Sequence, residues 1–299
     1  MVNEVKKPSN IVQRFVIGIP VGALAVCLMA YGNISLLVFI VICAWVSLRE
    51  FWKLAGVGRA GEGLPLARIG EIAAIILLYT TWAYPEGSFA VMLAIIVPVF
   101  FIYQLVRRAQ GADSYLREVS LVSLGVVYVA GLLSFIFKLR HLQIFFEKTG
   151  VLTFSTGFFH IPGMIHFTIF AVIASWGCDT AALLSGKSLG RTKLAPGISP
   201  KKTIAGLVGG MVGAATGVLI YAWLVGIIGQ VEIYELVAFG AMAAAFSQLG
   251  DLTVSAIKRE ANLKDTGSIL GPHGGVLDRI DGFLFALPAT YIFFLLVLG

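Results

Sequence analysis

The sequence contains little charge: Asp, Glu, Lys and Arg make up only 13% of its residues, against 58% for hydrophobic residues. Soluble globular domains carry about 25% charged residues. Together with a mean hydropathy of +0.92, this composition excludes a soluble globular domain and predicts a membrane protein.

Cysteine is also scarce. Cys27, Cys43 and Cys178 all lie in apolar stretches, so neither a disulfide framework nor the spacing of a zinc site is present. The motifs HExxH, GxSxG and the dinucleotide-binding fingerprint are absent as well. Ala181–Ser188 (AALLSGKS) approaches a P-loop, but Ala181 replaces the first glycine and the segment ends an apolar helix, whereas a P-loop follows a strand.

Long apolar stretches dominate the chain. Crossing roughly 30 Å of hydrocarbon takes about 20 apolar residues, and about nine stretches approach this length. We therefore predict an all-α polytopic integral membrane protein with about nine transmembrane helices. An N-terminal transmembrane region of about five spans (residues 1–150) would precede a C-terminal catalytic region (residues 151–299). The expected spans are Phe15–Tyr31, Ile34–Leu48, Ile69–Trp82, Phe89–Val106, Val119–Phe137, Ile165–Gly186, Ile204–Ile228, Tyr234–Gly250 and Gly282–Leu298.

The positions of lysine and arginine test this count, because cytoplasmic loops carry an excess of both. With a cytoplasmic N-terminus, all of the 22 except Lys138, Arg140 and Lys148 fall on the cytoplasmic side. This bias predicts a C-terminus on the far side of the membrane. It also explains the net charge of +6, so nucleic-acid binding is not indicated and an anionic lipid surface suits the chain. Arg49 and Glu50, at the end of the second span, are interpreted as interfacial.

One polar block interrupts the apolar C-terminal part, between the eighth and ninth spans. Its carboxylates could hold a metal and its cations could hold phosphate, a mixture that indicates phosphoryl or nucleotidyl transfer. If the eighth helix continues into the cytoplasm, its polar residues share one face. They are Asp251, Ser255, Lys258, Arg259 and Asn262. The alternative is a solvated helix extension with surface ion pairs.

The same block ends with two carboxylates and a glycine-rich turn. Asp278 and Asp281 are three residues apart, a spacing that fits Mg²⁺, although two surface acids paired with Arg279 are the alternative. Gly271–Gly275 (GPHGG) predicts a tight turn whose exposed N–H groups suit an anion. His273, within that turn, is a candidate for phosphate binding or proton transfer.

A second polar block lies between the sixth and seventh spans. Asp179 falls inside the sixth span, where an ionisable residue is a functional candidate; an acid bonded to a neighbouring helix is the alternative. The turn and basic residues that follow suit a triphosphate or lipid phosphate. They are Ser199, Lys201, Lys202 and Thr203. The closely spaced glycines of the seventh span predict close helix packing and not a ligand site. They are Gly206, Gly209, Gly210, Gly213 and Gly217.

Both blocks resemble the signature of the phosphatidate cytidylyltransferase (CDP-diacylglycerol synthase) family. The downstream match consists of Ser255, Lys258, Arg259, Lys264, Asp265, Gly267, Leu270, His273, Gly274, Gly275, Asp278, Arg279 and Asp281. The upstream match consists of Trp176, Asp179, Gly186, Gly190, Lys193, Leu194, Pro196, Ser199, Pro200, Lys202, Thr203 and Gly206. Three positions depart from the pattern: Ala205 replaces Glu or Gln, Ala182 an aromatic residue, and Gly282 a serine.

The resemblance implies transfer of a cytidylyl group from CTP to phosphatidic acid, yielding CDP-diacylglycerol and pyrophosphate in phospholipid biosynthesis. It implies an active site on the cytoplasmic face, in a bacterial cytoplasmic membrane, membrane lipids as surroundings, and a homodimer. Asp251, Asp278 and Asp281 would bind Mg²⁺, with a second cation left open, and Lys258 and Arg259 would complete the catalytic set. The expected substrate-binding residues are Asp179, Ser199, Lys201, Lys202, Thr203, Ser255, Lys264, Asp265, His273, Gly274, Gly275 and Arg279.

Two other functions stay open at this point. A cytidylyltransferase for a different lipid phosphate would need the same charged groups. A transporter that couples ion movement to Asp179 would place polar groups near the membrane midplane in two similar halves. The charges of this chain instead gather at one face, and its halves are unlike.

Overall fold

The computed structural model describes residues 24, 27–28, 33–57, 64–109, 115–154, 166–271 and 274–299. The N-terminal part begins with α2 (Asn33–Ala55), α3 (Leu64–Ala83) and α4 (Ser88–Ala109). It continues through α5 (Tyr115–Gly125), the π-helical turn η2 (Val126–Gly131) and α6 (Phe135–Thr149). The last three elements together form one apolar stretch of 35 residues.

The C-terminal part begins with α7 (His166–Leu189), followed by the short strands β1 (Lys193–Ala195) and β2 (Ser199–Thr203). The strands form an antiparallel hairpin in which Lys193 pairs with Thr203. Three helices follow: α8 (Ile204–Leu224), α9 (Ile233–Glu260) and α10 (Leu277–Leu298).

The described residues include eight helices that are long and apolar enough to cross a membrane. They match the second to ninth expected spans and confirm an all-α polytopic membrane protein. The first expected span, Phe15–Tyr31, lies almost wholly outside the described residues. Several helices extend beyond the expected spans. The helix α2 continues seven residues past Leu48, α9 runs ten residues beyond Gly250, and α10 begins five residues before Gly282. The helix α6 continues to Thr149, twelve residues past the expected end of the fifth span at Phe137.

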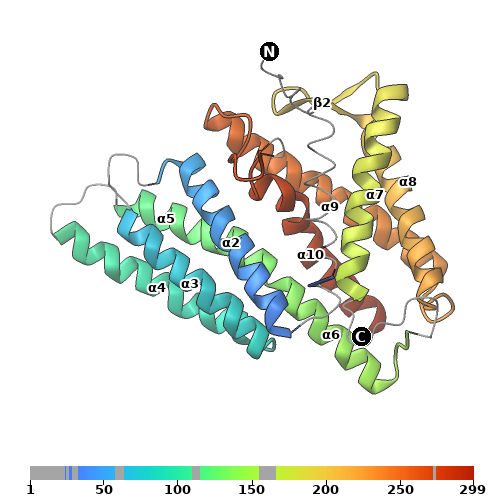
Figure 1. The fold of residues 1–299 in the computed structure, drawn as a ribbon, viewed down its shortest axis with the longest axis horizontal. Helices are drawn as coiled ribbons and strands as arrows, with labels where there is room; N and C mark the ends of the chain where they lie inside the picture. The colour runs from blue at the N-terminus through green and yellow to red at the C-terminus, as the bar shows by residue number, and fades with distance from the viewer. Residues whose placement is uncertain are drawn as a thin grey trace, which may run out of the picture.

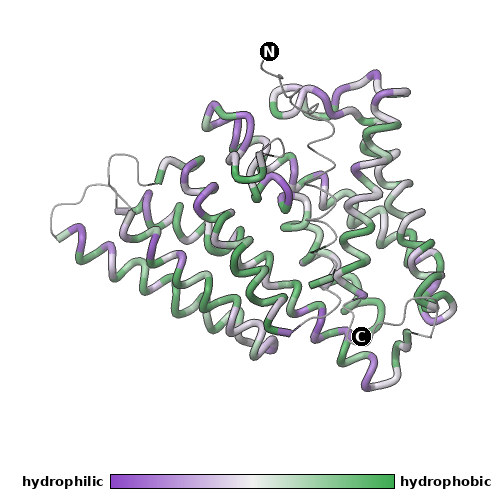
Figure 2. The backbone as a smooth tube through the Cα atoms, in the orientation of Figure 1, coloured by the Kyte–Doolittle hydropathy of each residue, from purple (hydrophilic) through white to green (hydrophobic). Residues whose placement is uncertain are grey.

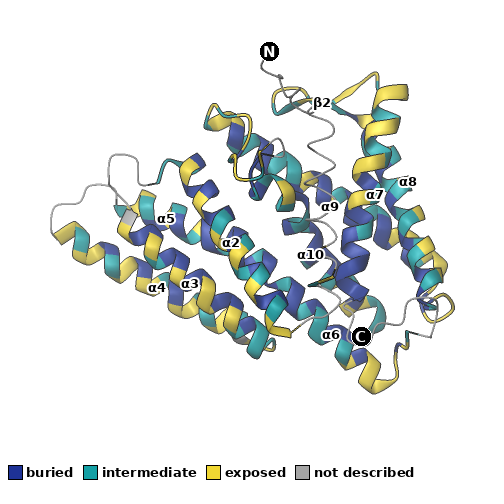
Figure 3. Cartoon of the chain, in the orientation of Figure 1, coloured by how far each residue is buried: buried dark blue, intermediate teal, exposed yellow. Residues whose placement is uncertain are grey.

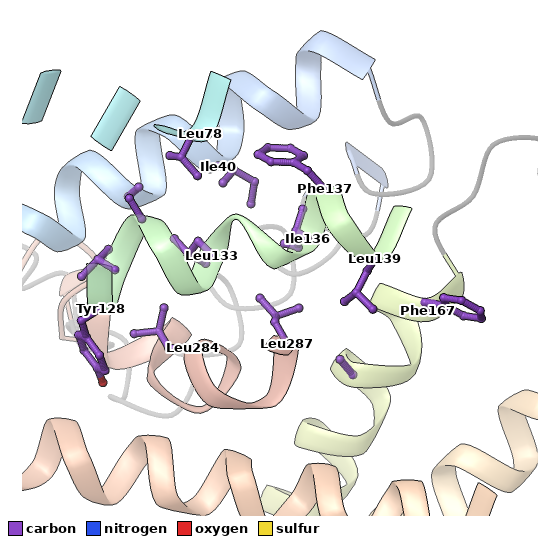
Figure 4. Packing of buried hydrophobic residues seen from close by; sticks show 14 of the residues in the cluster. Ile40, Leu78, Tyr128, Leu133, Ile136, Phe137, Leu139, Phe167, Leu284 and Leu287 are labelled. Atoms are coloured by element: carbon purple, nitrogen blue, oxygen red, sulfur yellow. The ribbon is translucent and has the colours of Figure 1, made fainter. Parts of the chain in front are cut away.

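The helices form a bundle whose middle is built from α6, α9 and α10 (Figure 1). Helices α2–α5 lie on one side of it and α7–α8 on the other. Leu133, just before α6, and Ile136 of α6 lie between Leu78 of α3 and Leu284 and Leu287 of α10 (Figure 4). All five side chains are buried, so α6 joins the two sides through one apolar core.

Polar groups gather at the two ends of the bundle, as Figure 2 shows. At one end, Arg140 donates to Asn33 at 3.4 Å and His141 contacts Glu86 at 3.0 Å. At the other end lie the β-hairpin and the start of α10. Much of α4 is exposed along its length, with 17% of its apolar stretch buried, against 44% for α3 and 33% for α10 (Figure 3). Apolar helix faces that are exposed between the two polar ends of the bundle are suited to contact with lipid.

The glycines of α8 pack against α7, as predicted. A Cβ atom at Gly206 would lie 3.1 Å from the carbonyl oxygen of Ala182, and one at Gly213 would lie 2.9 Å from that of Gly177. At Gly210 it would approach the sulfur of Cys178 to 2.8 Å. Small residues therefore let these two helices meet backbone to backbone, which fixes Asp179 of α7 relative to the β-hairpin.

Candidate active site

The two polar blocks of the sequence meet at one end of the bundle. Helices α9 and α10 touch there through Gly250 and Gly282: a Cβ atom on Gly250 would lie 3.1 Å from the Cα atom of Gly282. Asp251 and Asp281, the neighbours of these glycines, are thereby brought to the same contact. The hairpin that follows α7 lies beside them, because Lys202 of β2 reaches α9.

Three carboxylates, Asp179, Asp251 and Asp281, form what we call the acidic cluster. Asp251 is close enough to interact electrostatically with both Asp179 and Asp281. Asp281 accepts a hydrogen bond from the N–H group of Gly282 at 2.7 Å, and its other oxygen has no partner among the described residues. The cluster therefore concentrates negative charge where α7, α9 and α10 meet.

Cations from both blocks balance this charge. Lys202 forms an ion pair of 2.8 Å with Asp251 and donates to the carbonyl oxygen of Gln248 at 3.3 Å. Arg279 is exposed on α10 and interacts electrostatically with Asp179. Ser255 donates to the second oxygen of Asp251 at 3.2 Å. The expected substrate-binding residues Asp179, Lys202, Ser255 and Arg279 are thus brought together with two of the expected catalytic carboxylates.

Asp278 has different surroundings, although it is only three residues from Asp281. Lys258 of α9 donates to its Oδ1 atom at 2.7 Å, and both side chains are nearly buried, with exposures of 11% and 5%. Its Oδ2 atom accepts from the N–H groups of Thr266 at 2.8 Å and Gly275 at 3.0 Å. Hydrogen bonds of this number around a paired charge offset the cost of burying it.

The continuation of α9 is therefore not a solvated extension. Ser255 and Lys258 are buried, with 7% and 9% exposure, and their polar atoms face Asp251 and Asp278. Asn262 lies beyond the end of the helix, at a φ of 55°. The predicted polar face is thus directed into the protein over Asp251–Lys258.

The described part of the glycine-rich turn engages the N–H groups of Gly274 and Gly275 within the protein. Gly271 and Gly274 adopt positive φ angles of 56° and 80°, which favour glycine. The N–H of Gly274 donates to the carbonyl oxygen of Gly271 at 3.1 Å, and that of Gly275 donates to Asp278. These two glycines shape the turn and hold Asp278, so the expectation of exposed donors for an anion is wrong for them. His273 lies outside the described residues.

Sequence reasoning missed the contribution of Glu50. This residue of α2 is 4% exposed, so its side chain is enclosed by the protein, while its place at the membrane interface stays a prediction. Its carboxylate accepts hydrogen bonds from Thr266, Val276 and Leu277, all in or next to the downstream block. One local feature could have indicated its burial. Phe51 and Trp52 follow Glu50, and two large apolar residues at the end of α2 suggest that this end is covered by other parts of the protein. We call Glu50, Lys258, Thr266 and Asp278 the buried network.

Other expected site residues serve the local structure or lie on its surface. Thr203 caps α8 by accepting from the N–H of Gly206 at 3.0 Å. Arg259 donates to the carbonyl oxygens of Ile198 and Leu263 at 3.3 and 3.4 Å, which ties the hairpin to α9. The exposed members are Lys201, Lys264 and Asp265, while Ser199 is half-buried. Their roles toward substrates stay predictions.

The site offers a metal ion hard oxygen ligands, but they are not arranged as a complete coordination site. Among the described residues, no three carboxylate, imidazole or thiol groups are arranged so that they could hold a metal ion. Asp281 fits best, because among the described residues it keeps an unengaged oxygen, and Asp251 is close enough to interact with it electrostatically. Both oxygens of Asp251 are engaged, by Lys202 and Ser255, so Asp251 would have to release one of them. Both oxygens of Asp278 are already engaged. The assignment of these three residues as metal ligands stays a prediction.

Comparisons with known proteins agree with the chemistry of this site. A family model described as "Cytidylyltransferase family" matches residues 12–297. Phosphatidate cytidylyltransferase of Bacillus subtilis (strain 168) is 29% identical over 302 residues, which cover 96% of this chain and 97% of that protein. Phosphatidate cytidylyltransferase of a Synechocystis species is 30% identical over 303 residues, covering 97% and 98%. Phosphatidate cytidylyltransferase 4, chloroplastic, of Arabidopsis thaliana is 31% identical over 299 residues, covering 96% and 74%.

Proposed function

Because the chain belongs to the cytidylyltransferase family, we propose that it converts CTP and phosphatidate into CDP-diacylglycerol and pyrophosphate. It is a membrane-embedded nucleotidyltransferase, and its relatives carry the name phosphatidate cytidylyltransferase. One observation supports the proposal most strongly. Carboxylates and cations from two distant polar blocks meet at one end of an apolar bundle, where a lipid phosphate and a soluble nucleotide can both arrive.

The reaction joins two anions. A phosphate oxygen of phosphatidate attacks the α-phosphorus of CTP, a new P–O bond forms, and the bond between the α-phosphorus and the bridging oxygen breaks as pyrophosphate leaves. The nucleophile is already ionised, so no strong general base is needed. Positioning and electrostatic stabilisation account for most of the catalysis. Lys202 and Arg279 are placed to bind phosphate groups, because both lie beside the acidic cluster and keep contact with solvent.

Mg²⁺ is part of the proposal. Asp281 and Asp251 would hold it, Asp251 after releasing Lys202 or Ser255, and Asp278 would join them only after releasing Lys258 or one of its N–H donors. When bound, such an ion would neutralise charge on the phosphates and on the leaving pyrophosphate. Lys202 and Arg279 would orient the phosphates, and Lys258 holds Asp278 in the first turn of α10.

We further propose that the site faces the cytoplasm and that the enzyme is a homodimer in a bacterial cytoplasmic membrane. The distribution of lysine and arginine supports the orientation. Single cysteines at Ser268 and Glu86, in a background without the three native cysteines, test it by labelling with an impermeant maleimide. Ser268→Cys should react only from the cytoplasm and Glu86→Cys only from outside. Labelling of Ser268→Cys solely from outside would contradict the proposed orientation.

The function is tested directly with purified protein in detergent, labelled CTP, Mg²⁺ and phosphatidate. We expect labelled CDP-diacylglycerol and one pyrophosphate per turnover. Parallel reactions with a dolichyl-type or another lipid phosphate test the alternative substrate class. Turnover with another lipid phosphate but none with phosphatidate would replace the proposed substrate, and no labelled lipid from any acceptor would refute nucleotidyl transfer.

A further inference from the structure

Glu50 is a buried carboxylate in the part of the chain that lacks the catalytic blocks. It lies near the end of α2, where its neighbour Arg49 has 45% of its side chain exposed. Glu50 itself is 4% exposed. Burial of an acid is unfavourable unless both oxygens find donors, and here all donors among the described residues lie more than two hundred positions later in the chain.

The first set of donors belongs to the start of α10. The N–H group of Val276 donates to Oε1 of Glu50 at 3.0 Å, and that of Leu277 donates to Oε2 at 2.8 Å. Val276 is the N-cap of α10, and no side-chain cap forms from it. Free N–H groups and the positive end of the helix dipole both favour an acid at this point. Glu50 thus caps α10 from a different part of the fold.

The second contact runs through Thr266. Its hydroxyl lies 2.9 Å from Oε2 of Glu50 and 3.0 Å from Oδ2 of Asp278. Since a hydroxyl has one hydrogen, it donates to one carboxylate at a time, while the N–H of Thr266 donates to Asp278 at 2.8 Å. Thr266 therefore links Glu50 to Asp278, which lies in the first turn of α10.

The loop leaves no spare space around this carboxylate. A Cβ atom built on Gly267 or Gly275 would collide with the carboxylate of Glu50, and one on Gly275 would also meet the hydroxyl of Thr266. The backbone before α10 is thus closed around Glu50. A displacement of this side chain cannot be absorbed without moving the loop or the start of α10.

We propose that Glu50 is a positioning residue for nucleotidyl transfer: it fixes the start of α10, and with it the places of Asp278 and Asp281. The inference rests on the proposed function, because it assigns Glu50 a part in that reaction. Glutamine cannot replace the acid, since it has one acceptor oxygen and would direct an NH₂ group at a backbone donor. A shift of about 1 Å in catalytic groups can lower a rate by about 10²-fold.

Glu71 of α3 offers a matched control. It is also a buried acid of the N-terminal part, 9% exposed, and it accepts from Trp45 at 2.9 Å and Arg49 at 3.2 Å. Among the described residues it has no hydrogen bond or ion pair with the downstream block. Glu50→Gln and Glu71→Gln therefore make the same chemical change at comparable burial, and only the first touches α10.

The first experiment measures kcat and KM for CTP and phosphatidate with the full-length variants in detergent, next to their thermal unfolding. We expect Glu50→Gln to lower kcat about 10- to 100-fold with little change in KM, and Glu71→Gln to keep kcat within about 3-fold. Glu50→Asp keeps both acceptor oxygens one methylene further back, so it should recover part of the loss. Equal losses of kcat in Glu50→Gln and Glu71→Gln, or unchanged kcat in Glu50→Gln, would overturn the proposal.

A second readout does not depend on turnover. In a background without native cysteines, the maleimide reaction of Ser268→Cys reports exposure and motion of the loop before α10. We expect Glu50→Gln and Glu50→Asp to speed this labelling and Glu71→Gln to leave it unchanged. If the parent protein turns over no lipid while Glu50→Gln still speeds labelling, the proposed reaction fails and the structural link stands. Unchanged labelling in both Glu50 variants would refute the link itself.

Discussion

The acidic cluster and the buried network meet at the start of α10, which contributes Asp281 to the first and Asp278 to the second. They differ in how far their polar groups are buried and hydrogen-bonded. In the buried network, both oxygens of Asp278 have protein donors, and Lys258 and Glu50 are almost fully covered. In the acidic cluster, Asp281 accepts one hydrogen bond among the described residues, from the N–H group of Gly282, and one of its oxygens stays unengaged. Asp251 is engaged by Ser255 and Lys202, but its ion pair with Lys202 is 20% and 40% exposed. A buried and saturated region suits the holding of geometry, whereas a more exposed one with an unengaged oxygen suits exchangeable ligands. We therefore assign positioning to the first and substrate or metal contact to the second.

The largest expected effect is the loss of Asp281. Asp281→Asn removes a charge from the acidic cluster without leaving a partner unpaired, so the fold should persist. We expect turnover to fall about 10²- to 10³-fold, the scale of losing one electrostatic stabiliser of the transition state. Steady-state rates at saturating CTP and phosphatidate measure it. Glu260→Gln, at an exposed position at the end of α9, is the control, and near-parental turnover of Asp281→Asn would break the assignment.

The second largest expected effect is on the Mg²⁺ dependence of activity, which should change in variants of the acidic cluster and not in variants of the buried network. Asp251→Ala should move the Mg²⁺ activation curve to roughly 10-fold higher concentration or abolish activity, because it removes an oxygen ligand. Lys258→Ala should leave that midpoint nearly in place, since an ammonium group offers no lone pair to a cation. Titrations with free Mg²⁺ corrected for chelation by CTP compare the two. A shifted curve in Lys258→Ala together with an unshifted one in Asp251→Ala would reverse the roles of the regions.

The two ion pairs, Lys258–Asp278 and Lys202–Asp251, should differ in their contribution to the free energy of unfolding. Lys258→Ala leaves the nearly buried Asp278 without its cation, a change that typically costs about 3 kcal/mol or more. Lys202→Ala breaks a pair that is in contact with solvent and should cost less than about 1 kcal/mol. Unfolding of the purified variants in detergent gives both values. Equal destabilisation would show that burial does not separate the two ion pairs.

The smallest effect concerns the hydroxyl between two acids. Thr266→Val keeps the backbone donor to Asp278 and the size of the side chain, but it removes the O–H bond to Glu50 or Asp278. We expect a loss of about 1 to 2 kcal/mol in unfolding free energy and a decrease in kcat of less than about 10-fold. Thr253→Val, which alters an exposed hydroxyl that bonds only to the carbonyl oxygen of Leu249, is the control. A Thr266→Val variant as stable as this control would remove Thr266 from the buried network.

Much of the fold was predictable because membrane helices are encoded locally. Eight apolar stretches appear as helices, and the glycines of α8 make the close contact that their spacing indicates. The end of α9 was not predictable from hydropathy, because the helix continues beyond Gly250 where its residues become polar. Its polar residues are satisfied by partners on other elements: Asp251 pairs with Lys202 of β2, and the buried Lys258 pairs with Asp278 of α10.

The site was predictable as a set of residues and less so as a set of contacts. Asp278 and Lys258 were both identified, but as metal ligand and phosphate binder, while in the structure they are partners. Local spacing says nothing about which acid meets which base across 20 residues of loop and turn. Glu50 was missed for the same reason, because its partners lie 216 to 227 positions away.

The long separation between Glu50 and its donors has a consequence for biogenesis. Glu50 enters the membrane with the first described helix, whereas Val276 and Leu277 are synthesised only when the last helix follows. During that interval α2 carries an acid near its end without the N–H groups that later surround it. The acid can remain in the polar interface region until α10 arrives, so Glu50 becomes enclosed only when α10 packs against it. Enclosure of Glu50 and positioning of Asp278 therefore belong to the same step of assembly.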